Sequence, residues 1–122
     1  MSDTYLVAGG YGFIGAHVVR QLVRRGDRVL VIDRLPAGNS ADAVLDPRDR
    51  ERVVFLGTEL PGVAELTAIL AEHHVRCVVN LASPLASITE SEPGAVVRDM
   101  VDPHSRVLDA ALKAGVGRVV WA

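Results

Sequence analysis

Short apolar runs alternate with longer amphipathic stretches along the chain, a pattern typical of alternating strands and helices. The runs are rich in Val, Leu and Ile and nearly continuous, as in strands that are buried on both faces of a parallel sheet. Five strands are predicted in this way, over residues 5–8, 28–33, 52–56, 76–82 and 116–122.

The stretches between the strands predict helices over 13–25, 63–73, 93–101 and 103–114. In the first helix, Ile14, Val18 and Leu22 form one apolar stripe, and Gly26 ends it. Asp102 is a candidate N-cap of the last helix, with Pro103 at its first position. Residues 34–52 lack a sustained period and predict a surface connection with room for one helical turn.

Alternating strands and helices favour right-handed crossovers and a parallel sheet with helices on both faces. We therefore expect one domain over residues 1–122, a doubly wound α/β fold with five strands in the order 3-2-1-4-5. In such a sheet, a ligand binds outside the carboxyl ends of strands 1, 2 and 4, where the strand order reverses.

Composition narrows the range of partners. Of the 122 residues, 49% are hydrophobic and 23% charged, and the net charge is −2, which favours neither a disordered tail nor a nucleic-acid partner. No apolar run approaches the length of about 20 residues that a membrane span needs, so a soluble cytoplasmic protein is expected. The single cysteine, Cys77, lies in an apolar run and is expected to fill core space.

The strongest chemical signal is the turn after the first predicted strand, where 5–15 reads Tyr-Leu-Val-Ala-Gly-Gly-Tyr-Gly-Phe-Ile-Gly. Two registers fit: G-x-G-x-x-G starting at Gly10 and G-x-x-G-x-x-G starting at Gly9, both with Gly12 and Gly15. Each provides one glycine for the tight turn, one for close approach to a pyrophosphate and one for helix–strand packing. The next helix would direct its positive end at the phosphates.

An acid at the end of the second predicted strand completes this pattern. Asp33 follows Gly15 by 18 residues, close to the offset of about 20 residues at which a carboxylate binds an adenosine ribose. Arg34 could face a 2′-phosphate, but the neighbouring Asp33 would repel that group, so a solvated arginine is favoured. The spacing therefore predicts a dinucleotide site with a preference for NAD.

These residues carry a family resemblance. Residues 8–15 resemble the T-G-x-x-G-F-I-G fingerprint of the NAD-dependent epimerase/dehydratase family, the extended short-chain dehydrogenases that act on nucleotide sugars, and they favour the register that starts at Gly9. Residues 79–83 resemble its H-L-A-A stretch, and 108–111 with 115–120 resemble its L-E-A-A and G-V-x-R-x-V stretches. The resemblance implies a Rossmann-like fold and NAD as cofactor. The candidate cofactor-binding residues are Gly9, Gly10, Tyr11, Gly12, Phe13, Ile14, Gly15, Asp33, Arg34, Leu81, Ala82 and Ser83.

The chain also departs from that family. Residues 100–104 replace its N-V-x-G-T segment, and Gly57-Thr58 replaces the Gly-Asp that often ends its third strand. The family's proton relay, a Ser or Thr after strand five and a Tyr-x-x-x-Lys, has no counterpart here, and Lys113 is the only lysine. We therefore expect no catalytic residue in this chain and a domain that is truncated after strand five.

Other polar residues do not supply a substitute. His17 and His104 have no acid partner at a fixed spacing, and core or surface roles are favoured for them. Serines follow the fourth predicted strand without the surroundings of a nucleophile elbow, so they could at most touch substrate or cofactor. These serines are Ser83, Ser87 and Ser91.

Three functions remain open. The chain could be the cofactor-binding part of an NAD-dependent epimerase, dehydratase or reductase, a stand-alone nucleotide-binding or redox-sensing module, or a remnant that serves only protein contacts. If the chain stops after its fifth strand, residues 118–121 are expected to form an apolar edge, through which two copies could associate.

Overall fold

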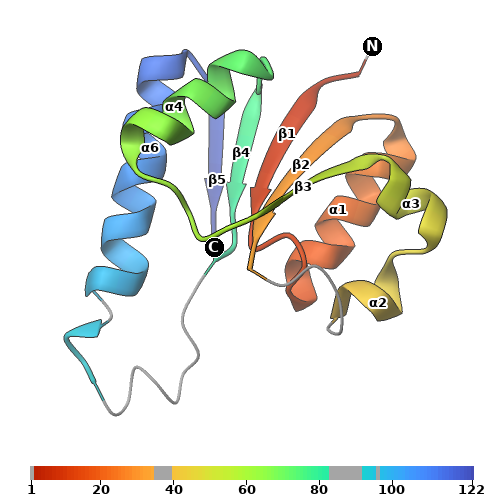
Figure 1. The fold of residues 1–122 in the computed structure, drawn as a ribbon, viewed down its shortest axis with the longest axis horizontal. Coiled ribbons are helices and arrows are strands. Elements are labelled where there is room, and N and C mark those ends of the chain that lie inside the picture. The colour runs from red at the N-terminus through yellow and green to blue at the C-terminus, as the bar shows by residue number, and fades with distance from the viewer. Residues whose placement is uncertain (1, 35–39, 83–91, 96) are drawn as a thin grey trace.

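The computed structural model describes residues 2–34, 40–82, 92–95 and 97–122. They form one five-stranded parallel sheet in the order β3-β2-β1-β4-β5, which confirms the predicted topology (Figure 1). The strands are β1 (Thr4–Ala8), β2 (Arg28–Asp33), β3 (Val53–Gly57), β4 (Cys77–Asn80) and β5 (Arg118–Trp121). β4 and β5 are shorter than the apolar runs that predicted them.

Helices cover both faces of the sheet (Figure 1). They are α1 (Phe13–Arg25), α2 (Ser40–Val44), α3 (Pro47–Glu51), α4 (Val63–Glu72) and α6 (Asp102–Ala114), with a π-helical turn η1 (Val97–Val101) directly before α6. Gly26 and Gly115 end α1 and α6 in the left-handed conformation, with φ of 98° and 73°, as the sequence predicted for a helix stop.

Alternating side chains of the strands β1 to β4 supply two cores. Val7, Val31 and Val79 face α1, whereas Leu6, Leu30 and Val78 face α4 and α6. Each Val or Leu that is fully buried in this way contributes about 1.5–3 kcal/mol through removal of apolar surface from water. The two cores therefore fix the sheet between its helices, and Cys77 is buried in the first of them, as expected.

The connection after β2 contains more helix than the sequence predicted. It forms α2 and α3 instead of a single turn. The Asp49 N–H donates to the Asp46 carboxylate at 2.8 Å, and the Asp46 N–H donates back to Asp49 at 3.3 Å, so the two carboxylates form a capping box at the start of α3. Arg24 of α1 donates to Asp49 at 3.1 Å and ties α3 to the fold.

Three details of the predicted helices were wrong. The helix predicted over 93–101 is not a single α-helix, because 93–94 form a turn and 97–101 form the π-helical turn η1. Asp102 does not cap α6, because the preceding residue already has helical backbone and η1 runs directly into the helix. Its carboxylate lies 3.3 Å from Arg106 Nε, one turn along. Ile14 does not join the apolar stripe of α1, since it is 61% exposed; the buried side of α1 is built around Ala16, Val19 and Val23.

No helix among the described residues is long and apolar enough to cross a membrane.

Candidate functional site

A cleft of about 980 Å³ lies at the carboxyl edge of the sheet, where the strand order reverses. The ends of β1, β2 and β4 and the first turn of α1 form one side of it. Among the predicted cofactor-binding residues, those in its wall are Gly9, Gly12, Phe13, Ile14, Gly15, Asp33, Arg34, Leu81 and Ala82. Gly10 and Tyr11 lie in the same turn but outside the wall, and Ser83 lies outside the described residues, as do Ser87 and Ser91.

The three glycines of the register that starts at Gly9 meet different steric demands. Gly9 has φ of +75°, and a Cβ there would lie 2.9 Å from the Ala82 amide nitrogen. At Gly15 a Cβ would overlap the Gly9 carbonyl oxygen. Gly12 differs from both, because its backbone is extended, with φ of −74°, and it faces the cleft. The closest contact of a Cβ added at Gly12 would be the Gly9 carbonyl oxygen, at 3.3 Å.

Gly12 is also the N-cap of α1. The amides of the first helical turn have no partner within the helix, and together with the helix dipole they give this end a partial positive charge. No acidic side chain lies in that turn to compensate it. The cleft therefore has a place for an anionic group beside Gly12.

Gly10 and Tyr11 support this turn from beneath. A Cβ at Gly10 would lie 2.8 Å from the Val31 side chain, so the turn lies directly on β2. Tyr11 is only 3% exposed, with its ring in the core on the α1 face. Both residues shape the turn without contributing to the surface of the cleft.

Asp33 lies at the end of β2, and its Oδ2 accepts a hydrogen bond from the Tyr11 N–H at 3.0 Å. Arg34 is also in the cleft wall, where its Nη1 lies 3.5 Å from the carboxylate of Glu59, another wall residue, and both side chains are about three-quarters exposed. An ion pair so exposed contributes little to stability. The cleft thus has one acid in contact with the glycine turn and an arginine held beside it by a second acid.

The residues on the far side of the cleft were not predicted from the sequence. They are Thr58, Glu59, Leu60, Arg98, Asp99, Pro103, Arg106 and Ala122. Arg106 Nη1 donates to the carbonyl oxygens of Leu60 at 2.9 Å and Pro61 at 3.0 Å, which joins α6 to the loop after β3. Thr58 and Glu59 directly follow a predicted strand, so the sequence could have indicated that their loop lies at the carboxyl edge of the sheet. Nothing in the sequence indicated the contact of Arg106 with that loop.

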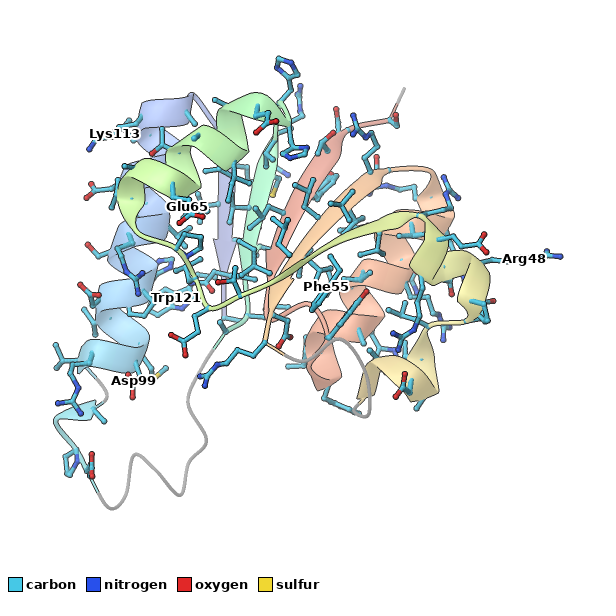
Figure 2. All side chains as sticks on the ribbon, in the orientation of Figure 1. Arg48, Phe55, Glu65, Asp99, Lys113 and Trp121 are labelled. Atoms are coloured by element: carbon cyan, nitrogen blue, oxygen red, sulfur yellow. The ribbon has the colours of Figure 1, made fainter. Side chains whose placement is uncertain are left out.

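A polar cluster closes the end of β4. Asn80 is 1% exposed; its Oδ1 accepts the Ala82 N–H, so its Nδ2 faces His104 Nδ1 at 3.3 Å. Burial lowers the pKa of His104, which agrees with a neutral ring that accepts at Nδ1. The ring stacks on Trp121 of β5 at 4.0 Å (Trp121 is labelled in Figure 2). His104 therefore has the surroundings of a packed histidine.

Metal chemistry has no candidate among the described residues, where no three His, Cys, Asp or Glu side chains gather closely enough to hold an ion.

Comparison with known proteins agrees with this site. The model of the NAD dependent epimerase/dehydratase family matches residues 5–122. The chain is 30% identical to a UDP-glucose 4-epimerase of Klebsiella pneumoniae over 122 residues, 96% of this chain and 86% of that protein. It is 31% identical to a dTDP-glucose 4,6-dehydratase of Xanthomonas campestris over 108 residues, 88% of this chain and 31% of that protein.

Solved structures show the same fold. A UDP-glucose 4-epimerase of Thermotoga maritima with UDP-glucose has a TM-score of 0.80 and 27% identity over 97% of this chain and 37% of that chain. A dTDP-glucose 4,6-dehydratase of Streptomyces venezuelae with NAD bound has a TM-score of 0.76 and 31% identity over 95% of this chain and 38% of that chain.

This chain thus spans less than two fifths of the length of these two structures, and 31% of the Xanthomonas enzyme. The matched family is NAD-dependent, and the shared part contains the glycine turn, Asp33 and the reversal of strand order. Since the family model covers all but the first four residues, this chain belongs to the NAD-dependent epimerase/dehydratase family.

Proposed function

We propose that residues 1–122 form a single NAD-binding domain and serve as the cofactor-binding part of an epimerase, dehydratase or reductase that acts on a nucleotide sugar. The observation that carries this proposal is Gly12. Close protein packing explains the glycines at positions 9 and 15, whereas at position 12 it leaves one tight contact, with the Gly9 carbonyl oxygen, and a side chain would lie at the cleft beside the helix N-terminus. A site for a pyrophosphate accounts for a glycine at that position.

The other residues of the cleft would bind the remaining parts of the cofactor. Asp33 would accept hydrogen bonds from the adenosine ribose, and Leu81 and Ala82 at the end of β4 would lie toward the nicotinamide. Phe13 and Ile14 would cover the pyrophosphate with their exposed side chains. Bound NAD would accept and return a hydride. The residues of this chain would bind the cofactor and orient it.

The chain is expected to bind NAD at least about tenfold more tightly than NADP, because the Asp33 carboxylate would face a 2′-phosphate dianion at close range. Asp33→Ser should narrow this gap. Isothermal calorimetry with both cofactors measures it.

Glu65→Gln is the matched control, since it removes an exposed carboxylate on α4 that does not line the cleft and leaves Asp33 in place. Its preference for NAD should remain near that of the unmodified chain. Tighter binding of NADP by the unmodified chain would instead make Arg34 a phosphate ligand.

The 122-residue chain by itself is expected to turn over no nucleotide sugar. Without a Tyr-x-x-x-Lys relay, proton transfer loses a contribution of about 10² to 10⁴ in rate, and residues that position the sugar are a further requirement. Binding should therefore persist without catalysis. Epimerisation or dehydration of UDP-glucose or dTDP-glucose by the purified chain, above the level of a mock purification, would contradict this expectation.

A stand-alone nucleotide-binding or redox-sensing module is the second candidate, because a cleft that could hold a dinucleotide is compatible with binding alone. The intact mass of the protein in its own cell separates the two. A longer product that contains Ser-Ser and Tyr-x-x-x-Lys indicates an enzyme, whereas a product of 13.0 kDa indicates a module.

We propose that two copies of this 122-residue chain associate through β5, which among the described residues pairs only with β4. Val120 and Trp121 are about half exposed there, and Arg118 is the only charge on the strand. Val120→Lys should keep the chain monomeric, whereas lysine at Val119 would perturb the core against which that residue packs.

Light scattering over a concentration series measures this association. Leu112→Lys on α6 is the control, because Leu112 is exposed but lies on a helix. A monomeric unmodified chain, or association that Leu112→Lys abolishes and Val120→Lys does not, would exclude pairing through β5.

A further inference from the structure

Tyr11 lies in the glycine turn, yet its ring points away from the cleft into the core. It stacks flat on Phe55 of β3, with 5.2 Å between the ring centroids and 6° between the planes (Phe55 is labelled in Figure 2). The guanidinium of Arg50 in α3 lies over the Tyr11 ring, 5.4 Å from its centroid. The ring is therefore held by two elements that are distant from the turn in sequence.

Burial raises the pKa of the Tyr11 hydroxyl, an effect that Arg50 partly opposes, so the ring is neutral at physiological pH. A neutral phenol stacked on Phe55 and covered by a guanidinium is an anchor and has no access to the cleft. The ring must therefore act through the backbone of Tyr11, which it anchors.

The backbone of the same residue contacts the functional side of the turn. The Tyr11 N–H donates to Asp33 Oδ2 at 3.0 Å. A peptide group is planar and the link from ring to backbone has only two side-chain torsions, so fixing the ring restricts the direction of this N–H. The hydrogen bond in turn restricts the rotamer of the Asp33 carboxylate.

We propose that Tyr11 is a positioning residue, held by Phe55 and Arg50, that fixes the Asp33 carboxylate for the two ribose hydroxyls and so sets how strongly the chain discriminates between NAD and NADP. This inference rests on the proposed function, since it concerns the same cleft. It gives a role to the connection between β2 and β3: α3, fixed by its capping box and by Arg24, carries Arg50 to the ring.

The test combines Tyr11→Ser and Phe55→Leu with calorimetry using NAD and NADP. Tyr11→Ser keeps the N–H but removes the anchored ring, and Phe55→Leu keeps an apolar side chain but removes the stacking partner. Each is expected to lower the ratio of the NADP to the NAD dissociation constant by about three- to tenfold. Val54→Ala is the matched control, because Val54 is the neighbouring strand residue, is partly exposed and lies outside the Tyr11 contacts; its ratio should not change.

A double-mutant cycle separates positioning from general destabilisation. In an Asp33→Ser background, Tyr11→Ser should leave the ratio unchanged, because the carboxylate that it positions is absent. An equal change in both backgrounds would overturn the proposal, and so would an unchanged ratio in both single variants that still bind NAD. An unmodified chain that binds neither cofactor would instead refute the proposed function itself.

A measurement without ligand tests the proposal even if a variant binds NAD too weakly for calorimetry. In the unmodified chain, the amide proton of residue 11 should exchange slowly with solvent deuterium in NMR spectra, since it is hydrogen-bonded to Asp33. Phe55→Leu should speed this exchange, and Val54→Ala should not. An unchanged exchange rate in Phe55→Leu would show that the ring is not needed to hold the contact.

Discussion

Gly12→Val is expected to weaken NAD binding by about 100-fold or more, equivalent to about 2.7 kcal/mol, while the domain stays folded. The valine side chain would project into the cleft at the N-terminus of α1, in the space that a pyrophosphate needs. Within the protein itself, its Cβ would meet only the Gly9 carbonyl oxygen at 3.3 Å. Calorimetry for binding and circular dichroism for thermal unfolding measure the two effects.

The chain contains a closely matched control for this variant. Gly62 is the N-cap of α4 and has nearly the same extended backbone, with φ of −64° against −74° for Gly12. A Cβ there would meet no atom within 4 Å, and Gly62 does not line the cleft. Each valine should cost about 1 kcal/mol of stability as a poor N-cap, and Gly12→Val should cost more because its Cβ meets the Gly9 carbonyl oxygen. Gly62→Val should bind NAD normally. Normal NAD binding by Gly12→Val would remove the main support for the proposed function.

Gly15→Ala is expected to destabilise the fold by about 3 kcal/mol or more. The added methyl would overlap the Gly9 carbonyl oxygen and lie 2.8 Å from Gly10 Cα, and both contacts are backbone atoms that cannot rotate away. The helix would have to move from the sheet. Thermal unfolding should show a melting temperature lower by on the order of 10 °C.

Gly62→Ala also serves as the control here, because the same methyl is added at the start of a helix in open space. Its melting temperature should change by only a few degrees. If Gly15→Ala melted like Gly62→Ala, the close packing of α1 on the glycine turn would be wrong.

The order of the strands was predictable because each apolar run is short and the stretches between them, except for residues 34–52, contain a segment with helical period, which together are typical of a doubly wound fold. The glycine turn and Asp33 were predictable for a different reason: positive φ and close packing restrict residue type strongly at Gly9 and Gly15. These local restrictions are visible in a single sequence. They placed most of the candidate residues at the edge of the sheet where the cleft lies.

Other features depend on contacts that sequence spacing does not reveal. Helices of five residues, such as α2 and α3, are too short to show a period, although Asp46, Pro47 and Asp49 were a readable capping signal. Helical spacing placed Ile14 on the apolar stripe of α1, whereas its position in the first turn leaves it exposed in the cleft wall, in agreement with its place among the candidate cofactor-binding residues. The contact of Arg106 with Leu60 joins residues 46 apart in sequence, and no local rule predicts it.

The stacking of Trp121 on His104 gives this protein a built-in optical reporter. The chain has one tryptophan, so all of its indole emission arises at the junction of β5 and α6. Ala122, the next residue, lines the cleft, and Asn80 links His104 to the end of β4. Emission from this single site therefore follows the carboxyl edge of the sheet without any added label, and it can be read during a titration or an unfolding experiment on the natural sequence.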